Sequence, residues 1–366
     1  MRFIPAESLV EGMIVGKSLY DKNHNLLLSE GSVVHSSYVE KILKLGYQGV
    51  YIDDEVSKDI VVKDVINDEI RMKMIQTVKD VCIYANGSNS NTKETKEKID
   101  KGLDITKKLI GNIVEELLMN KDTMVNLIDL KFFDDYTYFH SVNVAVLSIV
   151  MGVGIGLSKE DLFNLGLGAI LHDMGKIFVD KDVINKPSKL TPEEYEYVKK
   201  HSEFGYKYLK ETYQIPTAAY VGVLQHHEKY DGTGYPSNAS RDSISLIGRI
   251  ICIADVYDAL ISNRPYRAPL LPSEAMEYIM ANGGLMFDVN LTRVFARKVA
   301  PFPVGTYVQL SNGYKGIVSE NYEDACMRPQ VKIIMDPEGK RIMPRFIELK
   351  DDKSLRSVTV SAINNI

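Results

Sequence analysis

Residues 226–236 read HHEKYDGTGYP, two adjacent histidines followed by a loop with glycines at 232 and 234. Glycine tolerates backbone conformations that other residues avoid, so this loop can turn tightly and bring its backbone close to a ligand. Tyr235 can stack on such a ligand or hydrogen-bond to it. As a bare loop this would be a weak signal, but its place after the histidine pair predicts that Gly234 and Tyr235 form one wall of an active site.

The other histidines gather around this stretch. Of the seven in the chain, five lie between residues 140 and 227. Acids accompany them: Asp173 directly follows a histidine, Glu228 follows the histidine pair, and Asp255 lies on an apolar helix where an unpaired carboxylate would be costly to bury. A lone helical histidine is more often structural, but a cluster of this size favours a metal site. The candidate ligands are His140, His172, Asp173, His201, His226, His227 and Asp255.

These ligand types indicate the metal and its chemistry. Imidazole and carboxylate without thiolate suit iron, manganese, zinc or nickel. The candidates exceed one tetrahedral zinc site and suffice for two metals if Asp173 bridges, because a carboxylate has two oxygens. Two metals about 3.5–4 Å apart can clamp a phosphoryl group and lower the pKa of a bridging water. The pattern therefore predicts phosphoester hydrolysis by a metal-bridged hydroxide, with no protein nucleophile.

Nearby cations favour an anionic substrate. Lys176 closes the sequence HDMGK at residues 172–176, and Arg264 and Arg267 belong to NRPYR at residues 263–267, just past the helix that carries Asp255. Arginine suits bidentate contacts to phosphate, and lysine acts as a point charge. Taken singly, each of these cations is equally well explained as a solvated surface charge.

Composition limits the remaining possibilities. A chain of 366 residues suggests two or three domains. Its net charge of −5 argues against a general binder of DNA or RNA, which would usually be basic. The three cysteines, Cys82, Cys252 and Cys326, form no CxxC pair, so they indicate neither a thiol zinc site nor a disulfide framework. They fit a reducing compartment, and we expect a cytoplasmic protein.

One stretch resembles a membrane span. Residues 141–158 carry no charge, but they contain Asn143 and three glycines and follow a polar run. A buried core helix is the better interpretation, and no membrane partner is expected.

The ends of the chain read as small modules around a helical centre. Residues 1–60 predict an α+β module, in which Met13–Val15 and Leu26–Leu28 flank a turn-rich segment as a hairpin would. Residues 61–120 carry two amphipathic helices that can form a hairpin, mediating a homodimer or packing against the neighbouring domain. Residues 121–300 predict the helical catalytic domain. Residues 301–366, with two hairpin signals, predict a small β-barrel-like domain and tail.

Helix start signals place the candidate ligands. Ser158 predicts the start of a helix running to His172. Thr191 followed by proline and two glutamates starts a helix that carries His201. Residues 245–262 predict the apolar helix that carries Asp255.

Together, the HD pair at 172–173, the HHEKYDGTGYP stretch, Asp255 and RPYR at 264–267 closely resemble the HD-GYP family. This family is a branch of the HD metal-dependent phosphohydrolases, and the resemblance covers about half of the chain, residues 121–300. It implies a helical bundle that hydrolyses the bacterial messenger cyclic di-GMP to linear pGpG and often to GMP. The small module at the N-terminus resembles one often found ahead of such domains.

The resemblance also implies a role for each motif residue. Lys176 would contact the scissile phosphate, Arg264 and Arg267 would lie near the substrate phosphates, and Gly234 and Tyr235 would line the substrate pocket. Iron or manganese is the implied metal. A glutamate that some members use for a third metal is replaced by Tyr136 here, which favours a two-metal site. One metal would be held by His140, His172, Asp173 and Asp255, and the other by Asp173, His201, His226 and His227.

Two alternatives remain open from the sequence. The same chemistry can act on 3′,3′-cyclic GMP-AMP or another phosphoester, since the residues that recognise guanine cannot be placed. The domain can also be a non-catalytic cyclic di-GMP sensor that signals through the linker helices. The complete ligand set argues against a sensor, because a sensor has no need to activate water.

Overall fold

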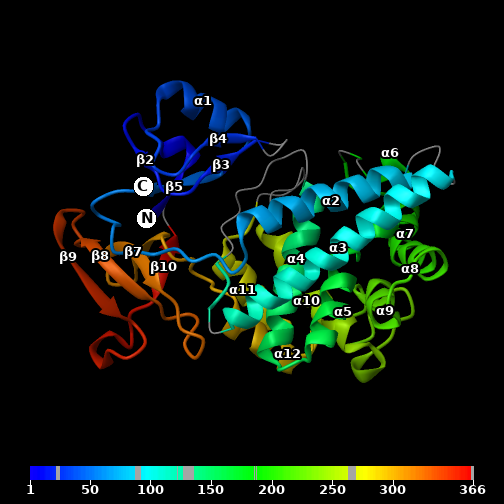
Figure 1. Ribbon diagram of the computed structural model, residues 1–366. Helices are drawn as coiled ribbons and strands as arrows, with labels where there is room; N and C mark the ends of the chain where they lie inside the picture. Colours follow the sequence, from blue (N-terminus) through cyan, green and yellow to red (C-terminus); the bar gives the residue numbers. More distant parts are fainter. Residues whose placement is uncertain are drawn as a thin grey trace.

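The computed structural model describes residues 1–21, 25–86, 92–121, 123–126, 136–184, 186, 188–262 and 269–363. The described chain is mainly helical, with a small α+β module at its N-terminus and a small β domain at its C-terminus (Figure 1). This is the fold class expected from the sequence.

The N-terminal module is built on a three-stranded antiparallel sheet in the order β1-β5-β2. The hairpin predicted between residues 13–15 and 26–28 is wrong in its first strand. Strand β4 pairs with residues 19–20 instead. The reason is burial: Val15 is fully buried opposite Ile52 of the central strand, which takes it away from the hairpin. The elements are β1 (Arg2–Pro5), η1 (Ala6–Ser8), β2 (Ile14–Val15), β3 (Leu19–Tyr20), β4 (Leu26–Leu28), α1 (Ser36–Lys44) and β5 (Gly49–Asp53).

Two long helices, α2 (Asp68–Asn86) and α3 (Lys93–Met119), lie side by side along the bundle (Figure 1). Helix α2 packs against α3, α4 and η3, and α3 packs against α4 and α5. Of the two alternatives, the structure shows that these helices pack against the helical domain. Dimer formation through them stays a prediction.

The helical domain surrounds α4 (Tyr136–Gly154), which packs against α5, α10 and α12. By length and composition α4 could cross a membrane, but 78% of the window Thr137–Gly154 is buried inside the protein, as expected of a core helix. The other helices are α5 (Lys159–Ile170), η3 (Met174–Phe178), α6 (Lys181–Ile184), α7 (Pro192–Lys199), α8 (His201–Thr212), α9 (Thr217–Gln225), η4 (Arg241–Ser243), α10 (Leu246–Ile261), α11 (Pro272–Ala281) and α12 (Val289–Lys298).

The predicted helix starts at Ser158 and Thr191 are confirmed, since each side chain accepts a hydrogen bond from the backbone three residues later. Two predicted extents are wrong. Helix α5 ends at Ile170, before His172, and the helix begun at Thr191 ends at Lys199, so that His201 opens α8 instead. At this break the Val198 carbonyl accepts a hydrogen bond from the His201 ring at 2.8 Å, which turns the ring back toward the bundle.

The C-terminal domain is a five-stranded antiparallel sheet in the order β10-β6-β7-β8-β9. Strands β6 and β7 form the first predicted hairpin, β8 and β9 form the second, and β10 pairs with β6 at the edge. It has its own apolar core, which includes Val308, Val318 and Ile333. Its elements are β6 (Tyr307–Leu310), β7 (Lys315–Glu320), β8 (Gln330–Met335), β9 (Arg341–Glu348), η5 (Lys353–Leu355) and β10 (Val360–Ile363).

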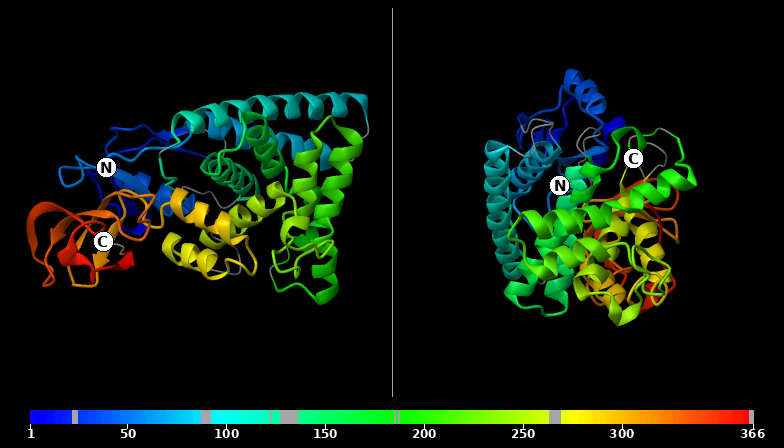
Figure 2. Two further views of the ribbon diagram at one scale, coloured as in Figure 1. Left: turned by 90° about the horizontal axis from the view of Figure 1, so that it is seen from below. Right: turned by 90° about the vertical axis from the view of Figure 1, so that its right-hand side faces the viewer.

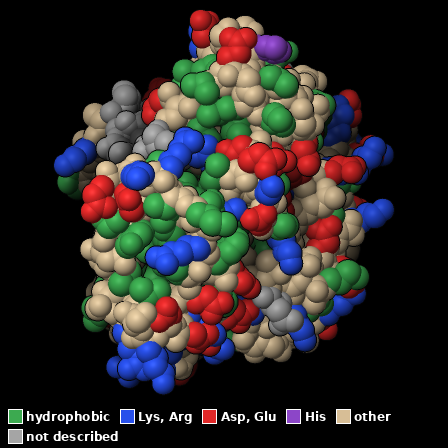
Figure 3. Space-filling model, turned by 90° about the vertical axis from the view of Figure 1, so that its left-hand side faces the viewer, with side chains coloured by type: hydrophobic (Ala, Val, Ile, Leu, Met, Phe, Trp, Pro, Cys, Tyr) green, Lys and Arg blue, Asp and Glu red, His purple; other side chains and the backbone are tan. Residues whose placement is uncertain are grey.

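The two terminal parts lie side by side at one end of the molecule (Figure 2). They share a small core in which Tyr51 and Ile60 pack with Tyr307 and Ile317. Acidic and basic side chains are interspersed on the face that both parts form (Figure 3). The side chains described there are therefore not arranged as the basic stripe typical of a nucleic-acid-binding surface.

Candidate metal centre

The structure brings all seven predicted ligands together in the middle of the helical domain. They come from separate elements: α4, the junction of α5 and η3, the start of α8, the end of α9, and α10. Their ligating atoms form three overlapping groups, each within 4.8 Å, and only the His227 side chain is appreciably exposed. The groups are His201 with His226 and His227, His140 with His172 and Asp255, and His172 with Asp173 and His226.

Three of the histidines are oriented by the backbone in the same way. Each donates from Nδ1 to the carbonyl three residues earlier, at the end or the start of a helix. This hydrogen bond fixes the tautomer and leaves Nε2 as a bare acceptor that faces the centre. The pairs are His172 with Ala169 (2.7 Å), His201 with Val198 (2.8 Å) and His226 with Val223 (2.7 Å).

These bare nitrogens fit a cation. The Nε2 atoms of His201 and His226 lie 3.2 Å apart, and the buried Nε2 of His172 has no hydrogen-bond partner among the described residues. Two lone pairs that face each other repel unless a positive charge lies beside them, and an unpaired buried acceptor is costly. A divalent metal would satisfy all three nitrogens.

The protonation states fit a metal as well. Burial lowers the pKa of His201 to about 4, that of His227 to about 3, and that of His226 well below its usual value. All three are therefore neutral at pH 7, and the neutral ring is the form that binds metals.

Asp173 lies between the groups and turns one oxygen to each side. Its Oδ2 lies 3.4 Å from His172 Nε2 and 3.9 Å from His140 Nε2, and its Oδ1 lies 3.5 Å from His201 Nε2. Burial by itself raises the pKa of Asp173, but the Lys176 ammonium, 2.5 Å from Oδ2, and the neighbouring imidazoles hold it well below its usual value. The carboxylate is ionised and placed as a bridging ligand would be.

Asp255 joins the centre from α10. Its Oδ1 lies 3.1 Å from His140 Nε2, and its Oδ2 lies 3.8 Å from His227 Nδ1. Burial alone raises the pKa of Asp255, but the hydrogen bond and charge of His140 outweigh burial and hold the pKa well below its usual value. A second carboxylate is thus ionised in the same buried space.

Two residues behind His140 were missed by the sequence analysis. Asp258, fully buried on α10, accepts a hydrogen bond from His140 Nδ1 at 2.7 Å, which aims Nε2 at Asp255. Asn143 on α4 donates to the other oxygen of Asp258 at 3.0 Å. The signal lay in the spacing: His140 and Asn143 are three residues apart on one helix, as are Asp255 and Asp258 on another, so each pair shares a helix face.

The loop after the histidine pair covers the centre on one side. Tyr235 packs on His227 with ring centroids 4.6 Å apart, and its backbone N–H donates to the His227 carbonyl at 3.2 Å. Gly234 has no room for a side chain, since a Cβ would lie 2.3 Å from the Lys229 nitrogen. Its role within the loop is therefore to let the chain pass closely enough for Tyr235 to reach His227.

Glu228 has a different role from the one expected. The sequence suggested that it assists the adjacent histidines, but its carboxylate accepts hydrogen bonds from the backbone N–H groups of Ser237 at 2.7 Å and Ala239 at 3.0 Å. These two hydrogen bonds anchor the far end of the loop.

Among the predicted substrate contacts, Lys176 lies at the edge of the centre with its side chain 35% exposed. Arg264 and Arg267 lie outside the described residues, as do the side chain of Tyr136 and the two acids that precede it. The roles of all these residues toward a metal or a substrate stay predictions.

Comparison with known proteins assigns families to two parts of the chain. Residues 118–291 match the family described as HD domain, and residues 307–366 match the KOW domain associated with HD domain. A cyclic di-GMP phosphodiesterase of Pseudomonas aeruginosa is 35% identical over 239 residues, which cover 65% of this chain and 58% of that protein. The cyclic di-GMP phosphodiesterase response regulator of Xanthomonas campestris is 33% identical over 191 residues, covering 51% and 50%.

A third relative carries a different substrate in its name. The 3′3′-cGAMP-specific phosphodiesterase 3 of Vibrio cholerae is 38% identical over 147 residues, which cover 40% of this chain and 32% of that protein. The chain spans about half the length of the two cyclic di-GMP relatives. With its HD pair, histidine ligand pattern and GYP loop, the helical domain of this chain belongs to the HD-domain family, in its HD-GYP branch.

Proposed function

We propose that this chain is a phosphodiesterase that hydrolyses cyclic di-GMP to pGpG, and onward to GMP, with two divalent metals, iron or manganese, in the cytoplasm. The observation that carries the proposal is the position of Asp173, whose two oxygens face two different sets of imidazole nitrogens. One metal would be held by His140, His172, Asp173 and Asp255, and the other by Asp173, His201, His226 and His227.

Such a metal pair, when bound, supplies activation of water and neutralisation of the phosphate charge. The remaining functions belong to the protein. Asp173 and Asp255 offset the positive charge of the centre, and the three backbone-oriented imidazoles fix its geometry. Lys176 keeps its partly exposed ammonium at the edge of the site, where it can hold a phosphate oxygen.

Other side chains at the site support hydrolysis without a covalent intermediate. Burial raises the pKa of Tyr235, so its hydroxyl stays protonated and can donate to the substrate. Burial also raises the pKa of the Cys82 thiol to about 12, which removes the thiolate that nucleophilic attack would need. Arg264 and Arg267 are proposed to hold substrate phosphates.

The second candidate substrate is 3′,3′-cyclic GMP-AMP. It is favoured by the likeness to a relative whose name specifies that nucleotide, with 38% identity over 147 residues. The two nucleotides share the phosphodiester that the centre would attack and differ only in one base.

One experiment tests both candidates. The purified protein is loaded anaerobically with Fe(II) or Mn(II), its metal content is measured, and each nucleotide is supplied separately for product analysis by chromatography. Formation of pGpG or GMP from cyclic di-GMP that a chelator abolishes supports the proposal. The rate at which cyclic GMP-AMP gives its own linear dinucleotide, compared with that rate, identifies the preferred nucleotide. Absence of turnover of both nucleotides at full metal occupancy contradicts the proposal and favours a sensor.

A further inference from the structure

Helix α2 reaches the metal centre through a chain of hydrogen bonds. This helix follows directly on the segment that leaves the N-terminal module, and it lies against the helical domain (Figures 1 and 2). Arg71, in its first turn, donates from Nη1 to Asn143 Oδ1 at 3.1 Å. Asn143 in turn donates from Nδ2 to Asp258 Oδ1 at 3.0 Å. Asp258 Oδ2 accepts a hydrogen bond from His140 Nδ1 at 2.7 Å.

We propose that Arg71 is a positioning residue for His140, acting through Asn143 and Asp258, so that the placement of α2 sets the metal affinity of the His140 side of the centre. This inference rests on the proposed function, because it takes His140 to be a metal ligand.

The physical role of Arg71 is to fix the direction of the Asn143 amide. A guanidinium only donates and an ionised carboxylate only accepts, so Asn143 satisfies both neighbours in one orientation, with its oxygen toward Arg71. Without Arg71 the amide can flip and place its oxygen against the buried carboxylate of Asp258. That arrangement replaces an attraction with a repulsion behind the ring of His140.

The consequence for the metal follows from the contact between His140 and Asp258. A carboxylate on the second nitrogen of a ligating imidazole fixes the ring and raises its basicity, and loss of such a partner typically costs about 10–100-fold in metal affinity. Arg71 acts two residues further away, through Asn143 and Asp258. We therefore expect its loss to weaken the metal site that contains His140 by about 3–10-fold, less than the loss of Asp258 itself would.

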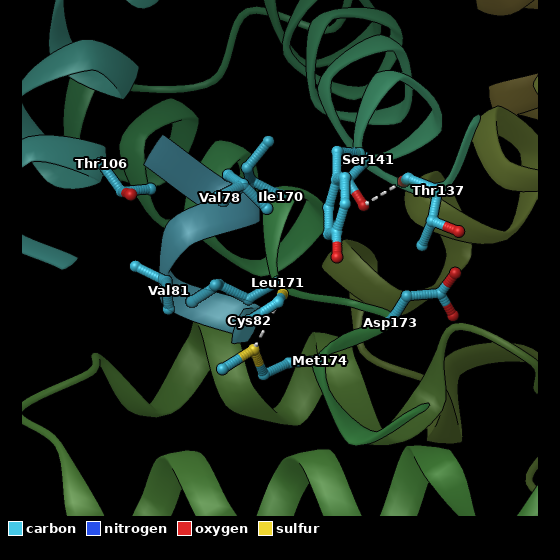
Figure 4. Close-up of a pocket in the computed structure, with 11 residues that line it drawn as sticks. Val78, Val81, Cys82, Thr106, Thr137, Ser141, Ile170, Leu171, Asp173 and Met174 are labelled. Carbon is cyan, nitrogen blue, oxygen red and sulfur yellow. Dashed lines mark hydrogen bonds between the residues drawn. The ribbon is translucent and has the colours of Figure 1, made fainter. Parts of the chain in front are cut away.

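A second contact of α2 lies behind Asp173. Val78, Val81 and Cys82 of α2 line a cavity of about 20 Å³ together with Asp173 and Met174 (Figure 4). The Cys82 thiol donates to the Met174 sulfur at 3.7 Å. Helix α2 thus also packs beside the bridging carboxylate, through residues other than Arg71, and the loss of Arg71 should leave this second contact in place.

The test compares three full-length variants. Arg71→Met removes the donors and keeps an apolar stem, Arg71→Lys keeps a cationic donor, and Lys73→Met removes an exposed charge from the same helix without touching the chain of hydrogen bonds. Mn(II) binding is measured by chelator competition, which reports two dissociation constants, and folding is followed by thermal unfolding. Arg71→Met should weaken one Mn(II) site by 3–10-fold and leave the other unchanged, Arg71→Lys should recover most of the loss, and Lys73→Met should match the original protein.

Equal Mn(II) affinities in Arg71→Met and Lys73→Met would overturn the proposal, as would equal weakening of both sites. If Arg71→Met fails to fold, Arg71→Gln, which removes the charge but keeps a polar side chain, is combined with Asn143→Ala instead. The glutamine should weaken the site by itself and add nothing to the effect of Asn143→Ala, and independent additive losses would contradict a shared path. Failure of the original protein to bind Mn(II) at all would instead reject the proposed function.

Discussion

The Nε2 atoms of His201 and His226 face each other at 3.2 Å, while the Nδ1 atom of each ring donates to a backbone carbonyl of its own helix segment. Neither ring can turn away without losing that hydrogen bond. The fold therefore holds two lone pairs close together, an arrangement whose cost a bound cation would remove.

Metal binding should therefore stabilise the folded protein. A metal at 100 times its dissociation constant contributes about 2.7 kcal/mol, which for a protein of this size corresponds to a rise in Tm of about 3–4 °C. The measurement is thermal unfolding of chelator-treated protein with and without Mn(II). An unchanged Tm in protein shown to contain the metal would contradict the role given to these rings.

Asp173→Asn should lower the metal content and abolish turnover, because the amide has one oxygen acceptor where the carboxylate has two. The fold should survive, since Lys176, the partner left behind, is partly exposed. Metal analysis, turnover and circular dichroism are measured together. Asp182→Asn, an exposed change on α6, is the matched control. Full metal occupancy and normal turnover in Asp173→Asn would reject the bridging role.

The metal-free protein should lose stability as the pH falls from 7 to 5. The pKa of His201 is about 4 and that of His227 about 3 in the fold, against an ordinary 6.5. Below pH 6.5 the unfolded chain takes up protons that the folded protein cannot, so stability is present above that pH and declines until the folded pKa is reached. At pH 5 each ring costs about 2 kcal/mol.

Urea unfolding of chelator-treated protein at the two pH values measures this loss. His201→Asn removes one of the titrating rings, so its loss between pH 7 and pH 5 should be smaller by about 2 kcal/mol. Equal stability of the original protein at both pH values would show that these rings are not held neutral by burial.

Gly175→Ala should be strongly destabilising and should reduce metal binding. A Cβ at this position would lie 1.8 Å from the His201 carbonyl oxygen, so η3 and α8 would have to separate and carry Asp173 away from His201. Gly111→Ala is the control: it lies within α3 with open space at its Cβ position, and it should stabilise the protein by up to about 1 kcal/mol. Thermal unfolding of both variants decides, and a neutral Gly175→Ala would contradict the close packing.

Much of the helical domain could be predicted because its signals are local. The caps at Ser158 and Thr191 act within one turn of their own helices, and the apolar run of α4 marks a core helix wherever it packs. The break at Lys200 escaped prediction because no proline or glycine marks it; it is accompanied by a ring-to-carbonyl hydrogen bond that only the folded site displays.

The sequence by itself determined which side chains could hold metals, because the HD pair and the histidine pair are adjacent along the chain and their chemistry is a property of residue type. Only the tertiary structure decided how they face one another. Asp258 accepts a hydrogen bond from His140, which lies 118 residues earlier in the chain. Glu228 accepts hydrogen bonds from the loop backbone and not from the histidines beside it in the sequence. Such choices follow from which helix faces pack together and which buried polar atoms must then be satisfied, and no local pattern of residues encodes them.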